Sequence, residues 1–304
     1  MAKSEAIRNI KKHSNMEKEQ KIIDKMPFRH LKIGNAQILD TVEGREICDH
    51  CFKSRKFFCY SCCLPVINEN YFPRIKLPVK IDIIKHAREI DGKSTAAHAA
   101  ILAPEDVKIF TYPDFPEILN KEETVLIFPS QTGVTVDSLF TKVVIEDNEI
   151  ITKRIKNMIP IKKAIFIDST WHQTKAIYKD QRLRDLQCVI LKSRISQFWR
   201  HQKESPRWYL ATIEAIHQFL IELHTCAFGM VQGYASIKSS EEKAVNEENS
   251  TNNIAQQYVN ELPEMDQRYR GQYDDLLYFF KYMYEKIHTM YDHDKLWAYK
   301  RPLM

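Results

Sequence analysis

The sequence has little glycine, and the spacing of its glycines excludes two common nucleotide-binding motifs. Only 7 of the 304 residues are glycine, and no spacing among them gives G-x-G-x-x-G or G-x-x-x-x-G-K-[S/T]. The dinucleotide fingerprint and the P-loop are therefore absent. The sequence also lacks the roughly 18–20 consecutive apolar residues that a membrane-spanning helix needs, and it begins without the apolar stretch of a signal peptide. We expect a soluble, intracellular protein without contact with a membrane.

The sequence also lacks a strong excess of either charge. Its 45 basic and 40 acidic residues give a net charge of +5, so affinity for a nucleic acid has to come from local clusters. Residues 153–163 contain five basic residues and no acid, and residues 193–209 combine four basic residues with four aromatic ones. Such a mixture is typical of surfaces that hold RNA phosphates and stack on unpaired bases. The alternative is a solvated face whose rings pack inward. The candidate RNA contacts are Arg194, Trp199, Arg200 and Lys203.

Short apolar runs rich in β-branched residues recur through the middle of the chain and predict strands that are buried on both faces. These runs are residues 79–86, 107–113, 124–130, 163–169 and 188–193. Helices are expected to begin at Ser94, Thr170, Ser205 and Tyr273. Strands that alternate with helices predict an α/β fold built on a mostly parallel sheet. In such sheets, ligands bind beyond the carboxyl ends of the strands.

Two polar segments interrupt this pattern. Residues 1–44 predict a flexible basic arm with one short helix, and residues 236–262 predict a surface insertion that buries too little apolar area to offset chain entropy. We assign residues 45–75 to a cysteine-rich segment and residues 76–304 to the main domain. Residues 1–25 carry seven basic and four acidic side chains, which suits a nuclear address, with the cytoplasm as the alternative.

Four of the seven cysteines follow the pattern C-x2-C-x7-C-x2-C, namely Cys48, Cys51, Cys59 and Cys62. Two tight C-x2-C turns can direct four thiolates at one tetrahedral centre, so the pattern predicts zinc. Four sulfur ligands leave no open position, and the zinc is therefore expected to be structural. Redox-active or simply reduced thiols are the alternative. Cys63 and His50 lie close enough in sequence to replace one ligand.

Asp168 ends a predicted strand and directly precedes a predicted helix. Its carboxylate is therefore expected at the ligand-binding edge of the sheet. A simpler interpretation is that Asp168, Ser169 and Thr170 cap the helix, whose first amides need acceptors. Spacing alone leaves both interpretations open.

The tetrapeptide Asp168-Ser169-Thr170-Trp171 is similar to the D-x-T-W signature of the DTW-domain family of aminocarboxypropyltransferases. The resemblance is strongest to the first of two animal paralogues and extends over about residues 45–290, including the four cysteines. Further matching segments are Phe128-Pro129, Gln173 and residues 76–86, 91–104, 193–203, 211–215 and 269–280.

This resemblance implies a fold related to the SPOUT RNA methyltransferases and leaves open whether the chain is knotted. It implies S-adenosylmethionine as co-substrate and tRNA as partner, with no role for DNA. The 3-amino-3-carboxypropyl group is expected to move to N3 of a D-loop uridine, at position 20, with release of methylthioadenosine. Asp168 is the expected base, or else holds the ammonium group of the co-substrate. The expected co-substrate contacts are Phe128, Pro129, Ser169, Thr170, Trp171 and Ser193.

Three other functions remain open at this point. A SPOUT-like methyltransferase would release S-adenosylhomocysteine instead of methylthioadenosine. An aminocarboxypropyltransferase acting on ribosomal RNA would share the fold and the chemistry. A zinc-bearing adaptor that only binds RNA would have no need of S-adenosylmethionine. The sequence does not determine the oligomeric state.

Overall fold

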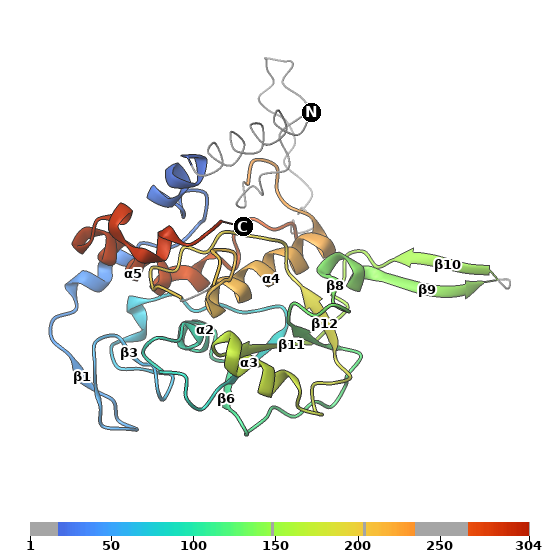
Figure 1. The fold of residues 1–304 in the computed structure, drawn as a ribbon, viewed down its shortest axis with the longest axis horizontal. Helices are drawn as coiled ribbons and strands as arrows, with labels where there is room; N and C mark the ends of the chain where they lie inside the picture. Colours follow the sequence, from blue (N-terminus) through green and yellow to red (C-terminus); the bar gives the residue numbers. More distant parts are fainter. Residues whose placement is uncertain (1–17, 147–148, 203–204, 235–266, 304) are drawn as a thin grey trace, which may run out of the picture.

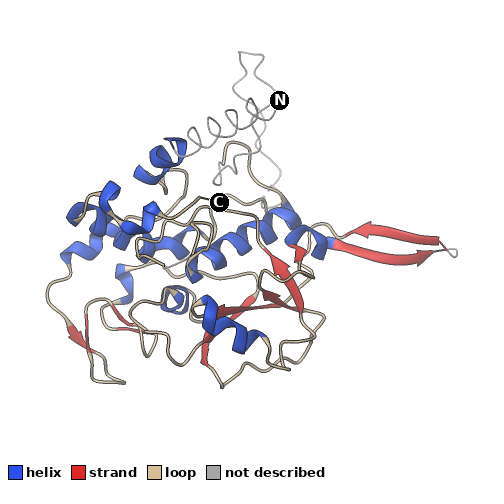
Figure 2. Cartoon of the chain, in the orientation of Figure 1, coloured by secondary structure: helices blue, strands red, loops and turns tan. Residues whose placement is uncertain are grey.

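A six-stranded parallel sheet forms the centre of the computed structural model, which describes residues 18–146, 149–202, 205–234 and 267–303 (Figures 1 and 2). In order across the sheet, the strands are β6 (Val107–Thr111), β5 (Lys80–Lys85), β11 (Lys163–Asp168), β7 (Thr124–Ile127), β12 (Gln187–Ile190) and β8 (Val134–Thr135). All neighbouring strands in this sheet are parallel. The predicted α/β class and five of the six strands are confirmed.

Helices cover both faces of the sheet because its strands are apolar on both sides. Ala164 and Phe166 of β11 point into a core shared with α2 (Ala96–Leu102) and α4 (Thr212–Phe228). Ile165, between them, packs on the opposite face, in a second core that contains Ile177 of α3 (Trp171–Tyr178). This alternation follows from the two-residue period of a strand. Helix α5 (Tyr278–Met290) packs behind α2, where Phe279 lies beside Leu102.

Smaller elements surround the sheet. Two antiparallel pairs, β1 (Glu46–Ile47) with β2 (Ser54–Arg55) and β3 (Phe58–Cys59) with β4 (Leu64–Pro65), lie in residues 46–65, which we call the cysteine module. A hairpin of β9 (Thr141–Glu146) and β10 (Glu149–Arg154) projects from the body (Figure 1). The short 3-10 helices are η1 (Ala36–Thr41), η2 (Glu69–Tyr71), η3 (Val136–Phe140), η4 (Asp274–Leu277), η5 (His293–Lys295) and η6 (Trp297–Lys300).

The predicted helix start at Ser205 is wrong, because α4 begins at Thr212. Tertiary contacts prevent the preceding segment from forming a helix. The Arg207 N–H donates to the Pro302 carbonyl at 2.9 Å, and the Arg207 carbonyl accepts from the Ser196 N–H at 2.8 Å. The helix starts where the Glu214 carboxylate accepts the Ala211 N–H at 2.9 Å. Local signals favoured the earlier start, but long-range pairing decided it.

Part of the predicted N-terminal arm contacts the body. Residues 1–17 and the whole of the predicted insertion, residues 236–262, lie outside the described residues. Residues 18–25 are helical, and the buried side chains Asp24, Phe28 and Leu39 hold residues 18–44 against the body. The division of the chain into domains remains a prediction. Among the described residues, no helix is long and apolar enough to span a membrane.

Histidine 98 makes the stability of this fold sensitive to acid. It is buried on α2 between the rings of Phe58 and Phe279, and burial lowers the pKa of His98 to about 4. In the unfolded chain, the His98 imidazole takes up a proton near pH 6.5, whereas in the folded protein it stays neutral down to about pH 4. Acid therefore stabilises the unfolded chain, and the free energy of unfolding decreases as the pH falls from 6.5 toward 4. Between pH 6.5 and 5 the loss is on the order of 1–2 kcal/mol. Urea unfolding of wild type and His98→Phe at both pH values tests this, because the variant should lose less stability than wild type by that amount.

Candidate active site

The Asp168 carboxylate is held between the starts of two helices. It ends β11 and is 6% exposed. Ser94, just before α2, donates its hydroxyl to Asp168 Oδ2 at 2.6 Å, and Thr212, the first residue of α4, donates to Oδ1 at 2.5 Å. Both oxygens are therefore fixed in direction by hydroxyls from segments far apart in sequence. The predicted strand-end position of Asp168 is confirmed.

Charged groups surround this carboxylate. Burial raises the pKa of Asp168 above its ordinary value, although the Ser94 and Thr212 hydroxyls and the Lys85 ammonium favour the ionised form. Lys85 ends β5 as the register partner of Asp168 and forms an ion pair with Asp91. Burial and the charge of Asp168 raise the pKa of Glu89. Asp168 can therefore accept a proton, and the Lys85 ammonium can stabilise negative charge on a group bound beside it.

The predicted co-substrate contacts follow three neighbouring strands at the same edge of the sheet. The Phe128 N–H, after β7, donates to the Val189 carbonyl at 3.1 Å, and the Phe128 ring stacks on Tyr178 with centroids 4.1 Å apart. Pro129 is exposed, as is Ser193 after β12. The carboxyl-edge loops of β7, β11 and β12 thus come together, as parallel topology requires.

The loop after β11 also starts α3. The Thr170 N–H donates to Gln173 Oε1 at 3.2 Å, which confirms the capping-box spacing. The Ser169 hydroxyl lies 2.7 Å from that of Thr174. Trp171 begins the helix, and its side chain lies outside the described residues. Capping therefore involves Thr170, while the Asp168 carboxylate accepts from Ser94 and Thr212 instead.

Two of the four predicted RNA contacts lie inside the protein. Arg194 is buried, with Nη1 3.3 Å from His217 Nδ1, and the buried Trp199 packs on Phe280 with centroids 5.1 Å apart. Both side chains hold the segment before α4 against the core. For Trp199 this agrees with the alternative interpretation, in which the rings pack inward. Arg200 is partly exposed and donates to the Gly92 carbonyl at 3.3 Å. Lys203 lies outside the described residues.

The four predicted metal ligands converge within the cysteine module. The Sγ atoms of Cys48, Cys51, Cys59 and Cys62 all lie within 4.8 Å of one another. A tetrahedral zinc with Zn–S bonds of about 2.3 Å separates its sulfurs by about 3.8 Å, so the cluster fits such an ion after small adjustments. His50 Nδ1 lies 3.4 Å from Cys62 Sγ, but the converging set consists of the four cysteines. These residues could hold a tetrahedral metal ion.

Sequence reasoning missed the side chains that contact or flank Asp168. Ser94 was identified only as a helix start, Thr212 was placed inside a helix, and Lys85 was counted as part of a strand. Each lies at a carboxyl edge or a helix start, where ligands to parallel sheets gather. That signal does not tell which of many such residues meet.

Comparison with known proteins gives a consistent result. The DTW domain matches residues 56–288 of the chain. A tRNA-uridine aminocarboxypropyltransferase 1 of Xenopus tropicalis is 36% identical over 94% of this chain and 95% of its own length. Proteins of the same name from Mus musculus and Homo sapiens are 37% and 36% identical, each over 86% of this chain and 84% of their own length. No solved structure matches.

Proposed function

The chain belongs to the DTW domain family, and from that premise we propose that it is a tRNA-uridine aminocarboxypropyltransferase. The observation that carries this proposal is the 36% identity to the Xenopus tropicalis enzyme across nearly the full length of both chains. The buried carboxylate at the carboxyl edge of the sheet supports it, because the reaction needs a group that handles a proton there. The expected target is N3 of a uridine in the D-loop of tRNA, at position 20.

The reaction exchanges one bond for another. A bond forms between uridine N3 and Cγ of the methionyl arm, while the bond between Cγ and the sulfonium sulfur breaks. The sulfur keeps the electron pair, so methylthioadenosine leaves, and the N3 proton passes to a base. S-adenosylmethionine supplies the activated carbon. The protein has to present N3 to Cγ rather than to the methyl carbon, which is a matter of placement.

Asp168 is the residue that we assign to the proton. Its raised pKa brings the carboxyl group closer to the range in which it can accept a proton and release it again. Ser94 and Thr212 are positioning residues, because each donates its hydroxyl to one oxygen of the carboxylate. The other role, holding the ammonium group of the co-substrate, uses the same charge.

The loops after β7, β11 and β12 are where we place S-adenosylmethionine. They present the hydroxyls of Ser169, Thr170 and Ser193, together with the partly exposed Phe128 and the exposed Pro129. Hydroxyls and backbone groups suit the amino-acid end and ribose of such a ligand. We extend the assignment to Trp171 because it directly follows the β11 loop, as the first residue of α3.

For tRNA, we retain Arg200 and Lys203 as phosphate contacts. Arg194 and Trp199 are buried in this structure, so we assign them to support of the loop and not to direct contact. The nuclear location is proposed on the basic residues of the N-terminal arm alone.

We propose zinc as the ion of the four cysteines. Cys59→Ser is expected to lose bound zinc, because a serine hydroxyl is a poor substitute for a thiolate. Elemental analysis of purified protein should give one zinc per chain for wild type and none for the variant. Cys188→Ser, which changes a buried cysteine of the sheet, is the control and should keep its zinc. Equal zinc in both variants would contradict the assignment.

The test of the function is the identity of the products. Purified protein, S-adenosylmethionine and an unmodified tRNA transcript with a D-loop uridine are incubated, and nucleosides and small molecules are identified by mass spectrometry. We expect aminocarboxypropyluridine and equal amounts of methylthioadenosine. Methylated RNA with S-adenosylhomocysteine would show a methyltransferase. An RNA-binding adaptor would give no product and no heat of S-adenosylmethionine binding in calorimetry.

A further inference from the structure

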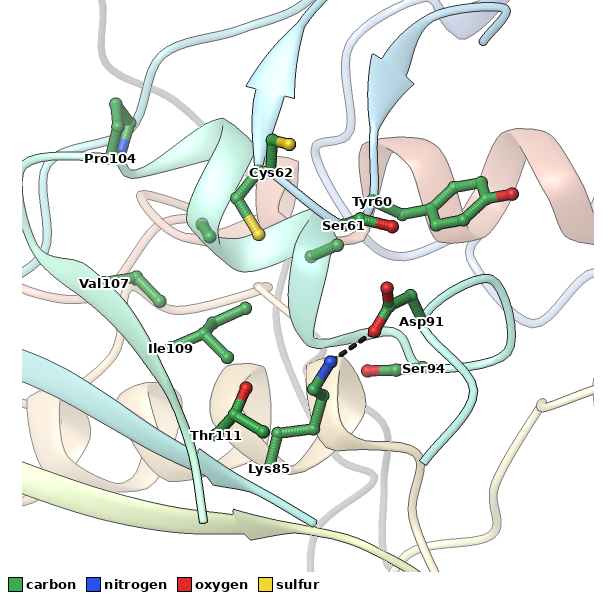
Figure 3. A pocket seen from close by; sticks show the side chains of 13 residues that line it. Tyr60, Ser61, Cys62, Lys85, Asp91, Ser94, Pro104, Val107, Ile109 and Thr111 are labelled. Carbon is green, nitrogen blue, oxygen red and sulfur yellow. Dashed lines mark hydrogen bonds and ion pairs between the residues drawn. The ribbon is translucent and has the colours of Figure 1, made fainter. Parts of the chain in front are cut away.

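A cavity of about 250 Å³ lies between the cysteine module and the edge of the sheet (Figure 3). Val107, Ile109 and Thr111 line it from one face of β6, and small residues of α2 leave it room. Residues 60–63 of the cysteine module form the opposite wall. Pockets for drug-sized ligands measure about 300–1,000 Å³, so this one suits a single pyrimidine ring better than a whole S-adenosylmethionine.

The polar end of this cavity adjoins the active site. Lys85 and Asp91 point toward one another there and form an ion pair (Figure 3). Ser94 also lines the cavity, and its hydroxyl donates to Asp168 Oδ2 at 2.6 Å. A group bound beside Lys85 would therefore be separated from the assigned base, Asp168, only by the Ser94 hydroxyl.

The order of the strands puts the cavity on one side of Asp168 and the co-substrate loops after β7 and β12 on the other, while the co-substrate loop after β11 begins directly after Asp168. The cavity lies over β5 and β6, and the loops follow β7 and β12, with β11 between them. A transfer reaction needs its nucleophile and its electrophile about 3–3.5 Å apart, with the base within hydrogen-bond reach of the proton that it takes, so the two binding sites have to meet beside Asp168. An arrangement of this kind would place N3 of a base in the cavity near Asp168 and turn it toward the loops.

We propose that this cavity receives the uracil of the target uridine, turned out of the tRNA loop, and that Lys85 stabilises the negative charge that uracil acquires when N3 loses its proton. The proposal rests on the proposed function. The flat faces of uracil fit the apolar side chains of β6, and its carbonyl oxygens accept hydrogen bonds from an ammonium group. Negative charge on a deprotonated uracil spreads onto those oxygens, where a fixed cation has its largest effect. The ion pair with Asp91 fixes the ammonium.

The rim of the cavity carries groups that suit the attached phosphate. Tyr60 packs so closely on Gly92 that a Cβ there would lie 3.3 Å from the ring, which fixes the cysteine module to this loop. Arg200 donates to the carbonyl of Gly92 at 3.3 Å, and Gly92 directly follows Asp91, which lines the cavity, so a second cation lies close to the cavity. Turning a base out of a loop is less costly than turning it out of a duplex. The cysteine module thus gains a role as one wall of the substrate site.

Crosslinking locates the target base without relying on turnover. A tRNA transcript with 4-thiouridine at the target position is bound to the wild-type protein, irradiated and digested, and the crosslinked peptides are identified. We expect crosslinks within residues 60–63 or 104–111. Crosslinks confined to residues 128–133 or 193–196 would overturn the proposal. If the crosslinks fall in the cavity but wild type forms no aminocarboxypropyluridine, the proposed function fails and the base-binding site stands.

A pair of variants on one strand tests the cavity itself. Ile109→Trp fills it, whereas Lys108→Trp adds the same ring on the exposed opposite face of β6. We expect Ile109→Trp to lower single-turnover transfer by about 100-fold with an unchanged Kd for S-adenosylmethionine, and Lys108→Trp to behave like wild type. Full activity of a folded Ile109→Trp, or loss of S-adenosylmethionine binding in it alone, would overturn the proposal. If this variant does not fold, the crosslinks on wild type decide.

The role of Lys85 has a test of its own. Lys85→Met keeps the length of the side chain and removes the charge. We expect it to lower kcat by about 100-fold while the Kd for tRNA stays the same. Lys85→Arg, which keeps a cation, should recover part of the rate. Equal rates for Lys85→Met and wild type would show that Lys85 does not stabilise the uracil.

Discussion

Asp168→Asn is expected to lower aminocarboxypropyl transfer by about 10³-fold, within the range that removal of a general base produces. Asparagine keeps the shape of the side chain but can no longer accept the N3 proton. The measurement is single-turnover transfer to a tRNA transcript at saturating S-adenosylmethionine, quantified by mass spectrometry. The base must be ionised, and burial raises the pKa of Asp168 above 3.8, the ordinary value for an aspartate. The wild-type rate should therefore fall on acidification with a midpoint above pH 3.8.

Asp82→Asn is the matched control. Asp82 is also a buried aspartate of the sheet, on the adjacent strand β5, and pairs with Lys163 at 2.8 Å, but it precedes the carboxyl edge. The folded variant should transfer at the wild-type rate. If Asp168→Asn kept more than about a tenth of the rate, a barrier change of less than 1.4 kcal/mol, Asp168 would not be the base.

Calorimetry separates the two roles that the charge of Asp168 permits. If the carboxylate holds the ammonium group of S-adenosylmethionine, Asp168→Asn should raise the Kd for this ligand. If it takes the proton from N3, the Kd should stay the same while the rate falls. Ser94→Ala and Thr212→Val leave the charge but remove its hydrogen bonds. Rate losses smaller than that of Asp168→Asn are therefore expected for both.

The sequence was sufficient to predict the parts of the fold and site that depend on neighbouring residues. The run Ala164–Asp168 is apolar up to its last residue, so both the strand and the position of Asp168 at its end could be deduced. The four cysteines form two C-x2-C turns that lie close together in the sequence, so the convergence of their sulfur atoms follows from the spacing. The period of Ile213, Ile216 and Leu220 likewise predicted the buried face of α4.

The sequence was not sufficient where distant segments decide the structure. The hydroxyl partners of Asp168 lie 74 and 44 residues away, and no local pattern encodes which helix starts meet. Arg194 looked like a surface cation, because arginine is mostly exposed. It is buried beside His217 on α4, which only the tertiary structure reveals. The same applies to Arg207, whose backbone hydrogen bonds with Pro302 and Ser196 keep its segment out of α4.

The N-terminal segment is fixed to the body by a buried ion pair, and its disruption should be the most destabilising of the changes considered. Arg207 and Asp24 are 2% and 1% exposed and form two hydrogen bonds, at 2.7 and 2.8 Å. Asp24→Ala leaves the guanidinium buried without its counter-charge. We expect a loss of about 3–5 kcal/mol in the free energy of unfolding, and a midpoint lower by about 10 °C. Urea and thermal unfolding followed by circular dichroism measure both.

Two further variants show whether burial is the cause. Asp185→Ala breaks an ion pair with Lys121 of the same 2.7 Å length, but those side chains are 63% and 50% exposed, so the loss should stay below about 1 kcal/mol. The double variant Asp24→Leu with Arg207→Met removes both buried charges and should recover most of the stability lost in Asp24→Ala. A double variant as unstable as Asp24→Ala would show that the contacts of Arg207 with the surrounding chain, rather than its unpaired charge, set the cost. The single changes alone cannot distinguish these causes, because each removes a charge and a set of contacts together.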